Sequence, residues 1–261
     1  MGRLDGKVAF ITGAARGQGR SHAIRMAQEG ADIIAIDLAA QIGTVPYAMA
    51  TPADLDETVR QVEALDRRIV ASIADVRDYD AVKSSLDAGV AQLGHLDIVS
   101  ANAGIESFAP AEQLTDEQFT DMLQVNLMGV WHAAKAAVPH LRAAGGGSMI
   151  FTSSFAGLAP LANNAHYTAA KHGVLGLTKV GAQEYGAEGV RVNAICPGVT
   201  DTPMVTSSLP KEILDQVLKT MPEGKMGRPD DVAAAAIWLC SDEARWVNGQ
   251  SLIVDGGGVV R

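Results

Sequence analysis

Short apolar runs alternate with helical patterns along the whole chain. The runs have the length and the content of valine and isoleucine typical of buried strands, and they cover residues 7–11, 32–36, 68–74, 97–100, 148–152, 191–195 and 251–254. Between them, helical composition or spacing marks residues 21–29, 52–66, 79–92, 117–141, 167–185 and 232–239. Because strands and helices alternate without a linker or repeat, we expect one α/β domain over residues 1–261. It should be a doubly wound parallel sheet of about seven strands with helices on both faces.

Glycines and polar residues stand at or directly after the ends of six of these strands. They are Gly13, Asp37, Asp75, Asn102, Ser153–Ser154 and Pro197–Gly198. In open parallel sheets the ligand lies beyond the carboxyl ends of the strands. We therefore expect a single site at this edge.

The glycine loop after the first strand predicts a nucleotide site. It reads Thr-Gly-Ala-Ala-Arg-Gly-Gln-Gly over residues 12–19, and it precedes a helix and a second strand that ends at Asp37. Glycines allow close backbone approach, and a helix N-terminus favours a pyrophosphate. The spacing Gly-x-x-x-Gly-x-Gly departs from the common Gly-x-Gly-x-x-Gly, so the prediction rests on the whole unit. Asp37 is placed to accept hydrogen bonds from an adenosine ribose, as in Rossmann folds.

Tyr167 and Lys171 are the candidate catalytic pair. They stand four residues apart, so on a helix they share a face. A free tyrosine has a pKa near ~10 and is a weak base at neutral pH. A lysine ammonium one turn away favours the phenolate, so we expect it to lower the pKa of Tyr167. Such a pair can take a proton from an alcohol or return one to a carbonyl.

Composition excludes several other functions. The formal charge of −9 on 261 residues disfavours nucleic acid and anionic membrane surfaces as partners. The sequence shows no secretory signal and no apolar stretch near the ~20 residues of a membrane span. Cys196 and Cys240 stand in apolar surroundings and form no metal-binding pattern, so we expect two reduced core residues, no metal and a cytoplasmic protein.

These motifs together resemble the short-chain dehydrogenase/reductase family over almost the whole chain. The resemblance rests on the glycine loop, Asp75-Val76, Asn102-Ala103-Gly104, Tyr167-x-x-x-Lys171 and Cys196-Pro197-Gly198. In that family a serine lies 13 positions and an asparagine 41 positions before the tyrosine, and Ser154 and Asn126 match. Gln18 departs from the usual aliphatic residue. With it, the opening of the loop resembles the carveol-dehydrogenase-like branch associated with the redox cofactor mycofactocin.

The resemblance implies a role for each residue. Tyr167 would be the acid/base, Ser154 would hold the substrate oxygen, and Lys171 would also grip the nicotinamide ribose. Asn126 would hold a water that links the lysine to solvent. The implied cofactor-binding residues are Gly13, Arg16, Gly17, Gln18, Gly19, Asp37, Leu38, Asp75, Val76, Asn102, Ala103, Gly104, Tyr167, Lys171, Pro197, Gly198, Val199 and Thr202. Singly, each has a structural alternative, such as a turn serine at position 154 or a helix N-cap at Asp75.

Two residues favour different cofactors. Asp37 would repel a 2′-phosphate and favours NAD. Arg16 stands where a basic residue supports NADP in this family. We give Asp37 more weight and expect NAD, with Arg16 paired to Asp37 or to the pyrophosphate.

An uncharged apolar insertion over residues 38–51 separates Asp37 from the predicted helix at 52–66. We expect it to pack over the adenine side of the cofactor, which suggests slow NAD release. In the resembling branch, NAD is retained and reoxidised in place by another acceptor. The alternative is a loop packed on the neighbouring helix.

The substrate side is less defined. Residues 200–226 are rich in methionine and aliphatic residues, which favours a lid over an apolar secondary alcohol or ketone, by resemblance a terpenoid of the carveol type. Asn163, Asn164 and His166 are candidates for contact with the substrate, but we favour the alternative that they are surface turn residues. The resemblance also implies a homotetramer. The alternatives are a generic NAD(P)-dependent ketone or 3-oxoacyl reductase with exchanging cofactor, and an NAD-sensing regulatory protein. The complete set Asn126, Ser154, Tyr167 and Lys171 argues against the regulator.

Overall fold

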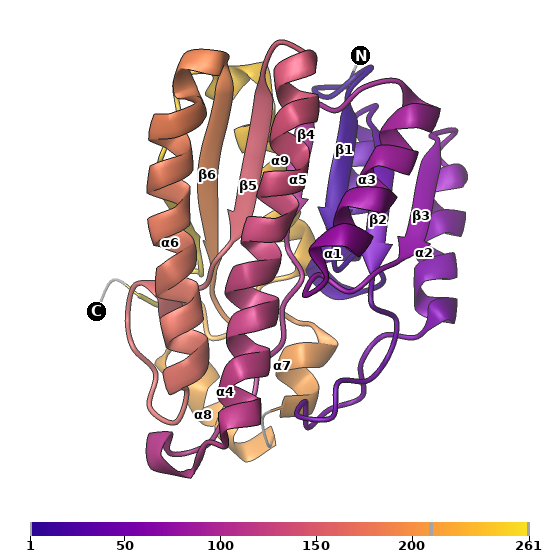
Figure 1. Cartoon of the computed structure of the whole chain (residues 1–261). Coiled ribbons are helices and arrows are strands. Elements are labelled where there is room, and N and C mark those ends of the chain that lie inside the picture. The colour runs from indigo at the N-terminus through magenta and orange to yellow at the C-terminus, as the bar shows by residue number, and fades with distance from the viewer. Residues whose placement is uncertain (1, 209–210, 260–261) are drawn as a thin grey trace.

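The sheet has seven parallel strands and a single reversal of strand order (Figure 1). The computed structural model describes residues 2–208 and 211–259. The strands are β1 (Val8–Thr12), β2 (Asp32–Asp37), β3 (Ile69–Ile73), β4 (Ile98–Ala101), β5 (Gly147–Thr152), β6 (Val190–Pro197) and β7 (Ser251–Val254). Their order is β3-β2-β1-β4-β5-β6-β7, so the expected single-domain doubly wound fold is confirmed. The order reverses between β1 and β4, where a crevice opens at the carboxyl edge.

Helices cover both faces. One layer contains α1 (Gly17–Gln28), α2 (Pro52–Glu63) and α9 (Pro229–Cys240). The other contains α3 (Tyr79–Leu93), α4 (Asp116–Leu123), α5 (Gly129–Ala143) and α6 (Ala165–Tyr185). Two short helices, α7 (Pro203–Ser208) and α8 (Lys211–Thr220), lie beyond the carboxyl ends of the strands, at the bottom of Figure 1.

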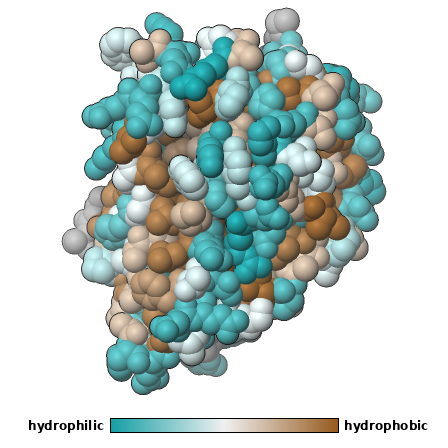
Figure 2. Space-filling model, viewed as in Figure 1, coloured by the Kyte–Doolittle hydropathy of each residue, from teal (hydrophilic) through white to brown (hydrophobic). Residues whose placement is uncertain are grey.

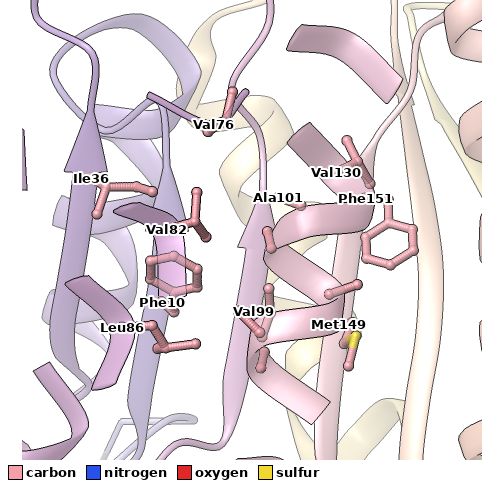
Figure 3. Packing of buried hydrophobic residues seen from close by; sticks show 14 of the residues in the cluster. Phe10, Ile36, Val76, Val82, Leu86, Val99, Ala101, Val130, Met149 and Phe151 are labelled. Atoms are coloured by element: carbon pink, nitrogen blue, oxygen red, sulfur yellow. The ribbon is translucent and has the colours of Figure 1, made fainter. Parts of the chain in front are cut away.

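Strand alternation distributes the core between two layers. In β1, Val8 and Phe10 enter the cluster under α3 and α5, whereas Ala9 and Ile11 enter the one under α1 and α9. Figure 3 shows Phe10 between Val82 and Leu86 on the first side. Because both faces are covered, every residue of β1 is buried. Fully burying a side chain of this kind contributes about 1.5–3 kcal/mol.

A buried histidine joins α1 to the sheet. His22 is fully buried, and its Nδ1 lies 2.8 Å from the Ser100 hydroxyl of β4. Burial lowers the pKa of His22 to about 4, because a charged imidazole has lost its water there.

Two helices differ from the sequence expectation. The first begins at Gly17 instead of residue 21, so the second half of the glycine loop is helical. The helix expected over 117–141 is divided by a π-helical turn, Gln124–Met128. There the Asn126 side chain donates to the Met122 carbonyl (3.2 Å). In a regular α-helix this carbonyl would accept from the backbone N–H of Asn126. Pro139 does not end α5, which continues to Ala143.

The remaining segments agree with expectation. Residues 38–51 contain neither helix nor strand. Cys196 and Cys240 are free and buried, as predicted. Among the described residues, none of the helices is both long and apolar enough to cross a membrane.

Candidate active site

One cavity of about 570 Å³ opens at the carboxyl edge of the sheet. It is bordered by the ends of β1, β2, β4, β5 and β6, the insertion 38–51 and α7–α8. All four predicted catalytic residues line it, and so does every predicted cofactor residue except Gly19. The sequence prediction of one shared edge therefore corresponds to one continuous cavity, of the size usual for ligand sites.

Gly19 supports the glycine loop from inside α1. A Cβ built on it would lie 1.9 Å from the Gly13 carbonyl oxygen, so only glycine lets the helix pack on the loop. Gly13 has φ 68° and approaches the Ala103 backbone so closely that a Cβ would lie 2.8 Å from the Ala103 Cα. These contacts fix the loop against the β4 end of the cavity.

Asp37 is held by the backbone rather than by an arginine. Its Oδ2 accepts from the Ala15 N–H (3.0 Å) and its Oδ1 from the Ala39 N–H (2.9 Å). Arg16 donates from Nη2 to the Ala48 carbonyl (2.8 Å), within the insertion. The expected Arg16–Asp37 pair is therefore not formed, and the arginine bonds the inserted segment instead.

A chain of charges runs from the cavity to α4. The Asp75 carboxylate pairs with Arg77 (2.7 Å), which also bonds Asp121 of α4 (2.9 Å). The other oxygen of Asp121 accepts from the Thr44 hydroxyl of the insertion (2.7 Å). The N-cap of α3 is Asp78, so the alternative of Asp75 as N-cap is wrong.

Ser154, Tyr167 and Lys171 meet where β5 and α6 face each other. The Lys171 Nζ donates to the Thr152 carbonyl (2.8 Å) and lies 5.5 Å from the centre of the Tyr167 ring. Burial lowers the pKa of Lys171 to about 8, while nearby Glu106 favours its charged form. Ser154 hydrogen-bonds Tyr167.

The pKa of Tyr167 corrects the sequence expectation. Burial raises this pKa well above its usual range, the Glu106 charge raises it further, and only the hydrogen bond to Ser154 opposes them. The Lys171 ammonium donates to the Thr152 carbonyl and lies 5.5 Å from the centre of the phenol ring, and without a bound cofactor the effect of burial is the larger one. The protein's own groups therefore hold Tyr167 as a neutral proton donor at pH 7.

Asn126 fixes the loop that follows β4. Its Oδ1 accepts from the Ile105 N–H (3.2 Å), and its amide donates to the carbonyls of Ile105 (3.0 Å) and Met122 (3.2 Å). Both amide protons are thus used within the protein, and a bridging water would have to bind other atoms of this residue. That part of the predicted role stays a prediction.

Two cavity residues were missing from the predicted site. Glu106 follows Asn102-Ala103-Gly104 directly after β4, so its position at the carboxyl edge could have marked it. Tyr47, in the insertion, is 7% exposed, and its hydroxyl accepts from the Glu106 N–H (3.2 Å). Burial raises the pKa of Glu106 to about 7 and that of Tyr47 to about 12. No local pattern predicted that contact, because it joins segments far apart in the sequence.

The turn before Tyr167 is more buried than expected. Asn164 and His166 are fully buried, whereas Asn163 is exposed and lines the cavity. His166 Nε2 lies 2.9 Å from the Ser107 hydroxyl, and Asn164 donates to the Ser107 carbonyl (3.2 Å). The surface-turn expectation is therefore wrong for these two residues, because they hold the loop that contains Glu106.

The outer wall of the cavity is mainly apolar. The insertion contributes part of it, and α7, α8 and the loops after β4 and β5 contribute the rest. The residues are Ile42, Tyr47, Met49, Phe108, Phe155, Leu161, Met204, Val205, Ile213 and Val217.

Comparisons with known proteins agree with this geometry. The sequence model of the family described as enoyl-(acyl carrier protein) reductase matches residues 13–258. A crystal structure of carveol dehydrogenase from Mycobacterium avium in complex with NAD is 46% identical, covers 100% of both chains and superposes with a TM-score of 0.95. The (−)-trans-carveol dehydrogenase of Rhodococcus erythropolis is 42% identical over 98% of this chain and 99% of its own. The 3-oxoacyl-[acyl-carrier-protein] reductase of Thermotoga maritima is 35% identical over 99% and 100%. The predicted resemblance to carveol dehydrogenases is thus confirmed.

Proposed function

Because this chain belongs to the short-chain dehydrogenase/reductase family and is an NAD-dependent oxidoreductase, we propose that it interconverts an apolar secondary alcohol and its ketone. The favoured substrate is a cyclic terpenoid-like alcohol of the carveol type. One observation carries the proposal: Ser154, Tyr167 and Lys171 line the same cavity as the glycine loop and Asp37.

The residues present fit NAD. Gly13 and Gly17 have positive φ, which shapes the loop before α1, and the N-terminus of α1 at Gly17 favours a pyrophosphate. The buried Oε1 of Gln18 has no partner in the described part of the chain. Asp37 would accept from the ribose hydroxyls and repel a 2′-phosphate, while Arg16 is engaged by the insertion. When bound, the nicotinamide supplies the hydride acceptor or donor.

The protein's own groups would position and move the proton. Ser154 would hold the substrate oxygen beside the Tyr167 hydroxyl, which donates a proton in ketone reduction and accepts one in alcohol oxidation. Oxidation needs the phenolate, so the positive charges of Lys171 and of the oxidised cofactor have to offset the effect of burial on the Tyr167 pKa. Asn126 keeps the Ile105 loop in place beside this group.

The insertion supports slow NAD release. Three hydrogen bonds tie it to other segments: Thr44 with Asp121, Ala48 with Arg16, and Tyr47 with the Glu106 N–H. Ile42, Val45 and Tyr47 are buried in the core under α3. Opening the wall would break these bonds and expose apolar surface, which raises the barrier to dissociation. We propose that NAD is retained and reoxidised in place by an external acceptor such as mycofactocin.

The surface supports self-association as a homotetramer. Large apolar side chains on the outer layer are exposed, among them Met128, Trp131 of α5 and Val180 of α6. Figure 2 shows hydrophobic residues gathered over α6. Patches of this kind favour contact with another protein surface. Light scattering of the purified protein gives the mass directly, and a monomer contradicts the proposal.

The test uses purified protein and its bound cofactor. Secondary alcohols, including carveol, are added with and without an artificial electron acceptor while NADH absorbance is recorded. We expect one stoichiometric burst without the acceptor and turnover with it. Tyr167→Phe should lower turnover at least about 100-fold while NAD binding changes little. If Tyr167→Phe keeps most of its activity, the proposed acid/base role is wrong.

A second candidate is a 3-oxoacyl reductase with freely exchanging cofactor. The description of the matching family and the 35% identity to the Thermotoga maritima reductase favour it. Reduction of a 3-oxoacyl thioester by added NADH or NADPH, faster than oxidation of any cyclic alcohol, would select this alternative.

A further inference from the structure

Glu106 is an acid in the part of the cavity next to Tyr167. The other carboxylates that line the cavity are Asp37 and Asp75, after β2 and β3; Asp37 accepts from two backbone N–H groups, and Asp75 pairs with Arg77. Glu106 follows β4 and stands among apolar residues such as Phe108 and Leu161. Glu106 lines the same cavity as Tyr167 and Lys171, and its charge affects the pKa of both.

The backbone around Glu106 is held on every side. The Ile105 N–H and carbonyl bond Asn126, and the Glu106 N–H bonds the Tyr47 hydroxyl. The Ser107 hydroxyl and carbonyl bond His166 and Asn164. The position of the side chain is therefore set by contacts with α6, the π-turn and the insertion.

The carboxylate itself has little protein contact. Its one hydrogen bond within the described residues comes from the Asn164 amide at 3.5 Å, and that amide is closer to the Ser107 carbonyl. No arginine, lysine or histidine of this part of the chain forms an ion pair with it. A carboxylate offers about four acceptor sites, so most of them face the cavity. A ligand that shields this half-buried carboxylate from solvent has to supply a donor in return, because an acceptor without a donor in an apolar site is costly.

We infer that Glu106 is a specificity-determining residue that accepts a hydrogen bond from a second hydroxyl or ammonium group on the substrate and repels a carboxylate. Among cyclic alcohols, those with a second hydroxyl or an ammonium group on the apolar ring should then be preferred over a mono-alcohol such as carveol. This inference rests on the proposed alcohol dehydrogenase function and narrows its substrates.

A substituted cyclohexanol series tests the inference. Cyclohexanol, its 3- and 4-hydroxy and 3- and 4-amino derivatives and 4-hydroxycyclohexanecarboxylate are compared by kcat/KM with the holoenzyme. Glu106→Leu removes the acceptor, and Glu106→Gln removes the charge but keeps one acceptor oxygen beside a new NH2 donor. Glu112→Gln, at an exposed acid in the short helix after Pro110, is the matched control.

The expected results are ratios between substrates. Measured well above pH 7, where the Glu106 carboxyl is ionised, Glu106→Leu should lower the preference for a diol over cyclohexanol roughly 10- to 100-fold, because a hydrogen bond to a charged acceptor is lost. Glu106→Gln should lower the preference for an amino alcohol at least about tenfold and raise that for the carboxylate. Glu112→Gln should leave every ratio unchanged. If all substrates change by one common factor, Glu106 acts through Tyr167 or the fold, and the inference is overturned.

A binding measurement separates this inference from the proposed function. Calorimetry of the same compounds with Tyr167→Phe and NAD needs no turnover. If the wild type oxidises none of the alcohols but binding keeps the Glu106-dependent order, the proposed function fails and the specificity assignment stands. If alcohols are oxidised but neither measurement shows that order, only the assignment of Glu106 fails.

Discussion

Tyr47→Phe removes one hydroxyl from the insertion and should accelerate NAD release. Tyr47 is 7% exposed, and its hydroxyl accepts from the Glu106 N–H at 3.2 Å. Phenylalanine keeps the ring packed with Ile42 and Val45 but leaves this N–H unpaired in the closed state. In the open state, water bonds the N–H in both proteins. The substitution therefore destabilises only the closed state.

The magnitude follows from the unpaired donor. Leaving a buried donor without an acceptor costs about 1–3 kcal/mol. At about 1.4 kcal/mol for each factor of ten, the opening equilibrium shifts roughly 5- to 150-fold toward the open wall. If opening precedes dissociation, the release rate of NAD rises by the same factor.

The assay is stopped-flow fluorescence of bound NADH chased with excess NAD. Tyr79→Phe is the matched control, because Tyr79 lies on α3 and outside the cavity. Thermal unfolding of both variants checks that the fold is retained. A release rate for Tyr47→Phe within twofold of wild type would refute the idea that the insertion limits release.

Other outcomes follow from contacts described above. Thr44→Val should also raise the NAD release rate in the stopped-flow assay, by about 10-fold or more, because Asp121 loses its hydrogen bond to the insertion but keeps its ion pair with Arg77. Thr44→Ser, which keeps the hydroxyl, should leave the rate unchanged. In Gly19→Ala the new Cβ would lie 1.9 Å from the Gly13 carbonyl oxygen. The variant should therefore either lose about 2 kcal/mol or more of stability, which thermal unfolding measures, or displace the glycine loop and lose NAD binding, which calorimetry measures. The pKa of His22 is about 4 in the folded protein and about 6.5 in the unfolded chain. The stability present above pH 6.5 is therefore lost as the pH falls toward 4, by about 3 kcal/mol in full. Urea unfolding at pH 7 and pH 4.5 should show a smaller difference for His22→Gln than for wild type, and equal differences would contradict this.

The sequence predicted the strands and the sheet edge well, for a physical reason. Runs such as residues 32–36 and 148–152 are buried on both faces, so their apolar content is continuous and their ends are marked by polar residues. Because all seven strands are parallel, those ends meet at one edge, and the residues after them meet in one cavity.

The errors arose where distant segments decide local structure. The Tyr167–Lys171 spacing indicated the right face of α6, but burial and the Thr152 carbonyl set the charges there. Arg16 was expected near Asp37, yet the Ala48 carbonyl of the insertion accepts its proton. The position of Glu106 after β4 could have marked it, but its contacts with Tyr47 of the insertion and Asn164 at the start of α6 join segments far apart in the sequence.

The π-helical turn over Gln124–Met128 has a consequence for altering this protein. Such a turn accommodates one residue more than regular winding, and each residue of an α-helix advances about 100° around its axis. Deleting one residue would restore regular winding there but rotate Asn126 or all of α5 by that angle. The orientation of the asparagine amide is thus encoded by chain length as well as by residue identity. Grafting this centre onto another scaffold requires an insertion, because substitutions alone leave the amide on the wrong side of the helix.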